Sequence, residues 1–249
     1  MIKWLFFDVG NVLVVDELYN ATLWTILLES ARARNPAVTL QTLMTERERL
    51  VLELEDPTPF DTQGRNLLGS TGWEEAKNPV REQLRDSWMD LNVPVPGWAT
   101  CLESLKGRFH LGIAANQPGT CRHHLQQLQL LEYFEVVGIS DDLGLAKPHA
   151  PFFHALLSEA KCDPGEAAMI GDRIDNDIAP AQRLSLKTIQ VCHPPAEWWF
   201  PTQTEVTTAY LESLRRAPAR GRGPANTDVQ ADAVVHSVDQ FTEALDQLV

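Results

Sequence analysis

Cysteine, basic residues and long apolar runs are scarce in this sequence of 249 residues. The four cysteines stand apart at positions 101, 121, 162 and 192 without a C-x-x-C pair, so neither a zinc ribbon nor a disulfide framework is predicted. Lys and Arg number 21 against 34 Asp and Glu, and the formal charge of -13 excludes non-specific nucleic-acid binding through a basic surface. No apolar run approaches the roughly 20 residues of a membrane-spanning helix.

The first residues also lack the layout of a secretory signal peptide. A single Lys precedes the apolar stretch, and no small-residue cleavage site follows it. Cleavage in this region would also remove Asp8. Together with the scattered cysteines, this pattern favours a reducing, cytoplasmic setting. The apolar fraction of 44% is enough for a real core, and the length suits one large domain or a core with a smaller partner.

Short apolar runs alternate with helix-like stretches through most of the chain. Six runs predict strands, at residues 3–9, 108–116, 133–140, 166–172, 186–192 and 231–238. Strands separated by helices are typical of βαβ units and of a mostly parallel sheet. The runs are continuous rather than alternating, which favours strands covered on both faces. We therefore predict an α/β fold with a doubly wound sheet.

Residues 16–94 follow a different pattern, with no convincing strand. Helical patterns occupy residues 20–34, 40–55 and 78–91. Asn78 followed by Pro79 predicts the start of the third helix, and the irregular stretch 56–72 predicts a loop before it. We interpret this segment as a helical insertion after the first strand.

The expected division of the chain is therefore an α/β core formed by residues 1–15 and 95–249, interrupted by a helical domain over 16–94. Residues 194–230 include an aromatic, Pro-rich stretch and one further helical pattern. They carry no chemistry that we can interpret from the sequence.

Polar side chains follow the ends of the predicted strands. Asp8 lies at the end of the first run just before Val9, Asn116 ends the second, Lys147 comes on the loop after the third, and Asp172 ends the fourth. Ligands of open parallel sheets bind beyond the carboxyl ends of the strands, so these side chains are expected to meet. Carboxylate oxygens suit Mg²⁺, and a metal with a lysine attracts phosphate. An ionised Asp8 could then act as a nucleophile.

Four motifs contain these residues, and together they resemble those of the haloacid dehalogenase (HAD) superfamily. They are FFDVGNVLV, LGIAANQ, LGLAKP and MIGDRIDNDI, in this order and each after its own predicted strand. Each motif alone is weak, but four in order are specific. The resemblance covers nearly the whole chain except residues 194–230, and it implies a Rossmannoid core with an α-helical cap of the type inserted after the first strand.

The resemblance implies roles in nucleophilic attack and phosphate binding. Asp8 matches the nucleophile of the first motif. Ala115 and Asn116 match the phosphate-binding second motif, and Lys147 matches the lysine that steadies both nucleophile and phosphate. The competing interpretations are a strand-end capping carboxylate for Asp8, a turn residue for Asn116 and a surface lysine for Lys147.

The fourth motif implies a Mg²⁺ site. Asp172 would bind the metal with Asp8 and the backbone carbonyl of Gly10, and Asp177 would lie beside it. The alternatives are a turn aspartate for Asp172 and a residue of the first helical turn for Asp177. Asp175 is expected to be a solvated turn residue, and none of the seven histidines is expected to act.

Two positions depart from the family's usual pattern. A second Asp, which protonates the leaving group, normally stands two residues after the nucleophile, where this chain has Gly10. The second motif normally has Ser or Thr where this chain has Ala115, so one hydroxyl donor is missing. Loss of one transition-state donor can cost about 10²–10³ in rate.

The resemblance therefore implies a Mg²⁺-dependent phosphohydrolase that acts on a small phosphorylated metabolite through an aspartyl phosphate. One alternative is a 2-haloacid dehalogenase, whose relatives also lack the second Asp and need no metal. The other is a catalytically weak or silent HAD-fold protein that binds a phosphorylated ligand or a protein partner. We expect no nucleic-acid or membrane partner and a monomer or homodimer, and the sequence carries no readable code for the substrate.

Overall fold

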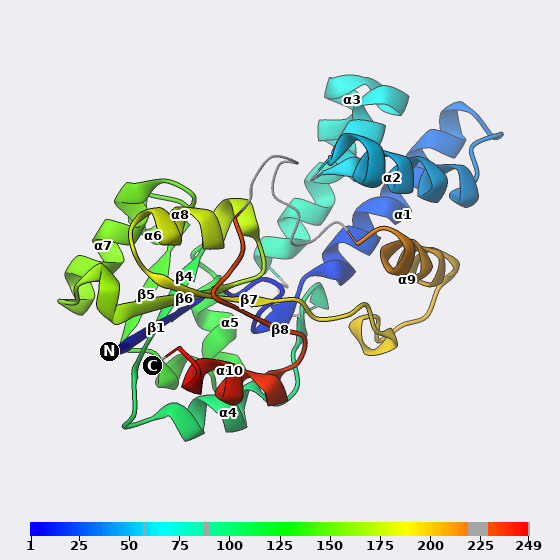
Figure 1. Ribbon diagram of the computed structural model, residues 1–249. Helices are drawn as coiled ribbons and strands as arrows, with labels where there is room; N and C mark the ends of the chain where they lie inside the picture. Colours follow the sequence, from blue (N-terminus) through cyan, green and yellow to red (C-terminus); the bar gives the residue numbers. More distant parts are fainter. Residues whose placement is uncertain (57, 87–89, 219–228, 249) are drawn as a thin grey trace. The chain divides into compact units, whose positions relative to one another are not determined.

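The computed structural model describes residues 1–56, 58–86, 90–218 and 229–248, and their contacts divide the chain into two compact units (Figure 1). Unit 1 comprises Met1–Val15, Pro94–His193 and the described residues from 229 onward. Unit 2 comprises Asp16–Val93 and residues 194–218. The expected division differs in two respects, because it grouped residues 194–218 with the sheet and Pro94 with the helical insertion.

Unit 1 is built on a six-stranded sheet with the order β5-β4-β1-β6-β7-β8, in which every neighbouring pair is parallel. The strands are β1 (Trp4–Phe7), β4 (His110–Ala115), β5 (Val136–Ile139), β6 (Ala167–Gly171), β7 (Lys187–Val191) and β8 (Ala233–Val235). Each lies within one of the six predicted runs, so the predicted α/β fold is confirmed. The strand order reverses at β1, which makes the carboxyl end of this strand the topological switch point.

Helices cover both faces of this sheet, as Figure 1 shows. One face carries α7 (Ala150–Ala160) and α8 (Ala179–Arg183), and the other carries α4 (Trp98–Leu105), α5 (Cys121–Gln127) and α10 (Phe241–Asp246). The continuous apolar runs in the sequence follow from this double cover, because no face of a central strand meets water.

Two adjacent phenylalanines of β1 show how the two faces are filled. Phe6 packs in the same buried cluster as Phe152 of α7. Phe7 points to the opposite face, where its ring centroid lies 5.5 Å from that of Trp98 and 5.6 Å from that of Phe241. Successive side chains of a strand point to opposite faces, so both residues are buried only because helices lie on both sides.

Short elements complete the chain. They are a two-stranded sheet of β2 (Val14–Val15) and β3 (Val93–Pro94), the short helix α6 (Ser140–Leu143), and the single turns η2 (Leu131–Tyr133), η3 (Pro164–Glu166), η4 (Ile174–Ile178), η5 (Glu197–Trp199) and η6 (Val238–Gln240). The two residues of β3 were not predicted as a strand, since so short a segment carries no period.

Unit 2 is helical, as predicted for residues 16–94. Its helices are α1 (Glu17–Arg34), α2 (Leu40–Leu54), α3 (Pro59–Asp86) and α9 (Glu205–Arg216). Polar contacts join α9 to the others: the hydroxyl of Tyr210 donates to Glu17 Oε2 at 2.6 Å, and Arg47 Nη1 donates to the carbonyl of Ser213 at 3.1 Å. Residues 194–218, which the sequence left without an interpretation, are thus a packed part of this unit, and positions 219–228 lie outside the described residues.

The predicted loop over 56–72 and the predicted helix start at Asn78 were wrong. Helix α3 begins at Pro59 and continues through Pro79, with one break at Gly69, where φ is 74° and ψ is 160°. Position 57 of the expected loop and positions 87–89 of the expected helix lie outside the described residues. Local turn signals were therefore overridden by packing within the unit.

The packing in question is that of Trp73, which is fully buried. The break in α3 brings its ring onto Gly64, where a Cβ atom would lie between 2.2 and 2.6 Å from ring carbons. Its Nε1 donates to Asp61 Oδ1 at 2.5 Å, and Lys77 Nζ donates to the same oxygen at 2.6 Å. The glycine that resembles a loop signal in the sequence makes room for an aromatic side chain.

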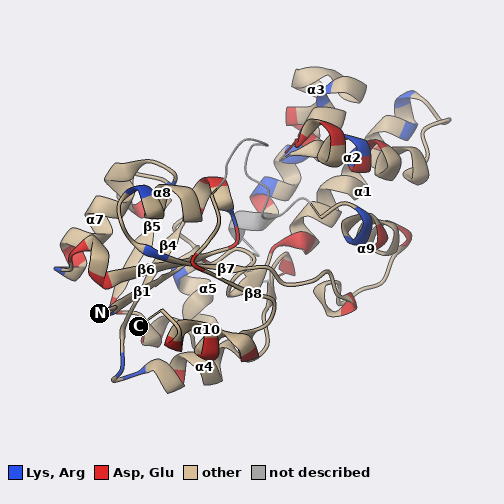
Figure 2. Ribbon diagram, viewed as in Figure 1, with Lys and Arg blue, Asp and Glu red and all other residues tan. Residues whose placement is uncertain are grey.

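No helix among the described residues is both long and apolar enough to cross a membrane. Figure 2 shows Asp and Glu spread over the helices of both units, with Lys and Arg set among them. Mixed charges of this kind are typical of solvated helix surfaces.

Gly64→Ala is expected to lower the melting temperature, although alanine is the better helix former. Overpacking against the Trp73 ring costs about 1–3 kcal/mol, whereas the propensity gain is about 1 kcal/mol at most. Gly72→Ala is the matched control in the same helix, because its methyl group meets the end of the Arg34 side chain, which donates to the Leu68 carbonyl, and not a buried ring. It should lower the melting temperature less than Gly64→Ala does. Equal shifts for both variants in thermal unfolding would contradict the packing of Trp73 on Gly64.

Candidate active site

Asp8 directly follows β1 at the switch point of the sheet. Its N–H donates to the carbonyl of Ile170 at 2.8 Å, so the ladder between β1 and β6 continues to this residue. Its Oδ1 accepts from the Val9 N–H at 2.8 Å and lies 3.0 Å from Lys147 Nζ. Within the described residues, the hydrogen bonds and ion pair of this carboxylate all fall on Oδ1. The other oxygen, Oδ2, is the one available for chemistry.

A tight turn carries the chain away from Asp8. The carbonyl of Val9 accepts from the N–H groups of Leu13 and Val14 at 3.0 and 3.1 Å. Asn11 adopts a left-handed backbone with φ of 56°, whereas Gly10 does not. The left-handed residue of this turn is therefore Asn11 and not the glycine before it.

Lys147 lies on the loop that follows α6. It is buried, and its Nζ donates to Asp177 Oδ1 at 2.5 Å in addition to its contact with Asp8. The loop is held by Asn116, the residue after β4, whose Nδ2 donates to the Lys147 carbonyl at 2.8 Å and whose Oδ1 accepts from the Lys147 N–H at 2.9 Å. The side-chain amide predicted to bind phosphate is thus engaged with the lysine backbone. Ala115 ends β4 and is fully buried.

Asp172 and Asp177 follow β6. Asp172 is buried, and the chain then forms the π-helical turn η4, in which the N–H groups of Asp177 and Ile178 both donate to the carbonyl of Arg173. This turn returns the carboxylate of Asp177 to the Arg173 N–H, which donates to Oδ2 at 3.0 Å. A Cβ atom at Gly171 would lie 2.4 Å from the Cβ atom of Asp177, so only glycine permits this approach.

The structure thereby brings Asp8, Asp172 and Asp177 into one group, in which one oxygen of each carboxylate lies within 4.8 Å of the others. Lys147 is the cation in contact with two of them. Three carboxylates against one ammonium leave a net charge of about -2 in a largely buried cluster. Hard oxygen donors with this excess of negative charge fit a divalent cation such as Mg²⁺.

Burial and neighbouring charges shift two protonation equilibria in this cluster. Burial raises the pKa of Asp8 to about 6; the ammonium of Lys147 opposes this shift, and the carboxylate of Asp177 adds to it. Burial alone would lower the pKa of Lys147, but Asp177 and Asp8 outweigh it and hold that pKa above its ordinary value. Lys147 therefore remains a cation, and Asp8 is ionised at neutral pH.

Asp175 lies outside the carboxylate cluster. It pairs with Arg173 at 2.5 Å, and its side chain is 37% exposed. A residue that sequence reasoning missed is Gln190, which is buried on β7 beside Gly171 and donates from Nε2 to the carbonyl of Asp172 at 2.9 Å. The signal for it was a long polar side chain near the carboxyl end of an apolar strand, which has to find a hydrogen-bond partner there.

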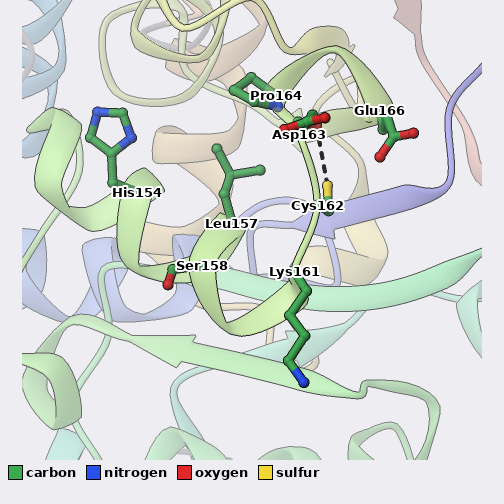
Figure 3. Close-up of a pocket in the computed structure, with 8 residues that line it drawn as sticks. All are labelled: His154, Leu157, Ser158, Lys161, Cys162, Asp163, Pro164 and Glu166. Carbon is green, nitrogen blue, oxygen red and sulfur yellow. Dashed lines mark hydrogen bonds between the residues drawn. The ribbon is translucent and has the colours of Figure 1, made fainter.

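A pocket of about 410 Å³ lies at the other end of β6, between the end of α7 and the loop that precedes the strand (Figure 3). None of its eight lining residues is among the predicted site residues. Burial, together with the carboxylates of Glu166 and Asp163, raises the pKa of the Cys162 thiol in this pocket to about 11. This thiol is therefore a poor nucleophile at neutral pH.

Comparison with known proteins gives matches in sequence. Residues 39–191 match the family model described as haloacid dehalogenase-like hydrolase. A glyceraldehyde 3-phosphate phosphatase of Pyrococcus abyssi is 28% identical over 195 residues, which cover 76% of this chain and 81% of that protein. A pyrimidine 5′-nucleotidase of Escherichia coli is 27% identical over 122 residues, or 47% of this chain and 54% of that protein, about half of its length.

Solved structures share the fold. A HAD-superfamily hydrolase of subfamily IA from Geobacter sulfurreducens superimposes with a TM-score of 0.64 at 18% identity, covering 100% of this chain and 97% of that one. A 2-haloacid dehalogenase from Pseudomonas syringae gives a TM-score of 0.55 at 23% identity over 100% of both chains. With the family match over residues 39–191, these likenesses lead to one conclusion: the chain belongs to the haloacid dehalogenase-like hydrolase family.

Proposed function

We propose that the protein is a Mg²⁺-dependent phosphohydrolase that acts on a small phosphorylated metabolite through an aspartyl phosphate on Asp8. The observation that carries the proposal is the buried group of Asp8, Asp172, Asp177 and Lys147 at the switch point of the sheet. The phosphatase and nucleotidase named among the relatives support a phosphate ester as the substrate. Cytoplasmic localisation and a monomeric or homodimeric state remain predictions.

The residues of this site divide the chemistry between them. Asp8 Oδ1 is held by Val9 and Lys147, so Oδ2 attacks phosphorus, and the bond from phosphorus to the leaving oxygen breaks. Water then attacks the phosphorus of the aspartyl phosphate, the bond to Asp8 breaks, and inorganic phosphate leaves. Lys147 balances the negative charge of the phosphoryl oxygens, and the second motif, Ala115 and Asn116, contributes backbone N–H groups to them.

Mg²⁺ would be held by Asp8, the carbonyl of Gly10 and Asp172, with Asp177 beside it. When bound, the ion supplies positive charge that offsets the charge of the phosphoryl group and of the carboxylates. Asp177 also holds the ammonium of Lys147, so its two oxygens are shared between the lysine and the backbone of Arg173.

The alternative function is that of a 2-haloacid dehalogenase, which is favoured by the missing side chain at Gly10. The group of three carboxylates weighs against it, because a metal-independent reaction has no use for so much buried negative charge. A catalytically silent binding protein is the other alternative, and the missing hydroxyl at Ala115 favours it.

Asp8→Asn is expected to abolish phosphate release, with a loss of roughly 10⁴-fold or more, because an amide cannot attack phosphorus. The matched control is Asp175→Asn, which removes an aspartate from the same edge of the sheet without touching the cluster. It should retain activity within about threefold, a change that counts as small on the scale of catalytic losses. Turnover of a phosphate ester by both variants checks the pair. Full activity in Asp8→Asn would remove Asp8 from the mechanism.

The same variant also provides a test of folding. The pKa of Asp8 rises from its ordinary 3.8 to about 6 on folding, so its ionisation costs stability as the pH rises through this window. Asp8→Asn removes this cost. Without metal, the variant should melt at or above the wild-type temperature near pH 7.5 and lose this advantage near pH 4. The opposite trend would mean that the Asp8 carboxylate is stabilised by the fold.

Mg²⁺ is expected to raise the melting temperature of the wild-type protein, because binding to the folded state alone stabilises it. Asp172→Ala should abolish this rise, whereas Asp175→Ala should retain it. Ca²⁺ should compete, since oxygen ligands alone do not exclude the larger ion. Thermal unfolding across a titration of each ion measures all three effects. An unchanged Mg²⁺ response in Asp172→Ala would place the metal elsewhere.

Gly10 leads to a prediction about substrates. Without an acid two residues after Asp8, the leaving oxygen must depart with little protonation, and a placed acid is typically worth about 10²–10⁴ in rate. Aryl, acyl and anomeric sugar phosphates should therefore be hydrolysed much faster than primary alkyl phosphates. A series of kcat/KM values against leaving-group pKa, at fixed pH and saturating Mg²⁺, is the measurement.

Gly10→Asp is the companion variant, which restores the carboxylate that the family usually has at this position. It should help the poorest leaving groups most. A flat series in the wild type, with chemistry rate-limiting, would mean that another residue donates the proton.

A further inference from the structure

The carboxamide of Asn116 is bonded at both ends to one residue. Its Nδ2 donates to the carbonyl of Lys147 at 2.8 Å, and its Oδ1 accepts from the N–H of Lys147 at 2.9 Å. The two residues are 31 positions apart in the chain. One side chain at the end of β4 therefore fastens the loop that carries the lysine.

These bonds satisfy main-chain groups that no regular element would satisfy. Lys147 lies in a turn, outside every helix and strand, and it is nevertheless buried. A buried N–H or carbonyl without a partner costs free energy comparable to a lost hydrogen bond. Asn116 supplies a partner for both, which makes it the main-chain support of this position.

The other end of the same lysine lies among the carboxylates. Its Nζ is 3.0 Å from Asp8 Oδ1 and 2.5 Å from Asp177 Oδ1. Four rotatable bonds join this ammonium to the backbone, so its location depends on where the backbone is held. A misplacement of about 1 Å in a catalytic group can cost about 10²-fold in rate.

We propose that the side chain of Asn116 is a positioning group, which acts on the bound phosphate through Lys147 and not by direct contact of its amide. The inference rests on the proposed function, because the affinity for phosphate is used as the measure of where the Lys147 ammonium lies. It also replaces the role expected from the sequence, in which the amide itself binds phosphate. The Oδ1 and Nδ2 atoms of Asn116 are both hydrogen-bonded to the backbone of Lys147, which fixes the orientation of the amide.

A double-mutant cycle separates the two roles. The proteins are wild type, Asn116→Leu, Lys147→Met and the double variant, each in saturating Mg²⁺. The measured quantity is the dissociation constant of inorganic phosphate by calorimetry, with the melting temperature recorded for each protein. Asn116→Leu should weaken phosphate binding about 10–100-fold, the usual effect of losing a residue that orients a ligand-binding group. The double variant should bind phosphate no more weakly than Lys147→Met, within about twofold.

The opposite result is equally clear. If the double variant is weaker than Lys147→Met by the full factor that Asn116→Leu causes alone, the amide contacts phosphate itself, and the inference is overturned. Gln182→Leu is the matched control, because this amide also holds a loop carbonyl, that of Gln230 at 2.7 Å, but does so away from the cluster. It should change phosphate affinity by less than about twofold, since distant sites behave independently.

Lys147→Met leaves two buried carboxylates without their cation and could fail to fold. Lys147→Arg keeps a cation between them and provides a second cycle with Asn116→Leu. In this cycle too, the losses of phosphate affinity caused by the two substitutions are expected not to add. A wild-type protein that binds no phosphate would overturn the proposed function and this inference with it. A wild type that binds phosphate, with additive losses in the cycle, would overturn the inference alone.

Discussion

The ammonium of Lys147 between the carboxylates of Asp8 and Asp177 is the interaction on which the site depends. Each buried, ionised carboxylate carries an effective penalty of several kcal/mol, and a pair without a cation would share its protons instead of keeping its charge. The ammonium of Lys147 lies 3.0 Å from Asp8 Oδ1 and 2.5 Å from Asp177 Oδ1, and its charge offsets part of this penalty. Asp172 adds a third carboxylate, so the carboxylates outnumber this ammonium, and such a set of hard oxygen donors fits a divalent cation.

Much of this arrangement could be predicted, because it follows from topology. Asp8 and Asp172 each come directly after a strand, and β1 and β6 are parallel neighbours, so their carboxyl ends must coincide. Strands that are covered on both faces appear in the sequence as continuous apolar runs, which are easily recognised. The motif residues can then be located from the ends of these runs. The fold and the proximity of these carboxylates are therefore predictable from local patterns in the sequence.

The remainder could not be predicted, because it depends on contacts between distant parts of the chain. In the sequence Gly64 resembles a loop residue, but in the structure it lies in helix α3 against the ring of Trp73. This contact explains the glycine, and it cannot be read from the sequence. The side-chain amide of Asn116 could bind phosphate, yet its hydrogen-bond partner is the backbone of Lys147. No spacing in the sequence distinguishes an amide that faces a ligand from one that faces a turn.

Because α9 belongs to unit 2, this unit cannot complete its folding when its first three helices have been synthesised. During synthesis α1, α2 and α3 emerge first, but Arg47 of α2 is buried against Ser213 and Tyr210, which come more than a hundred residues later. The first three helices must therefore wait with an incomplete core while the central strands of the sheet emerge. Unit 2 can be completed only after β4, β5, β6 and β7 have left the ribosome, because all four precede α9 in the chain. The helical insertion, although encoded early, is therefore completed late.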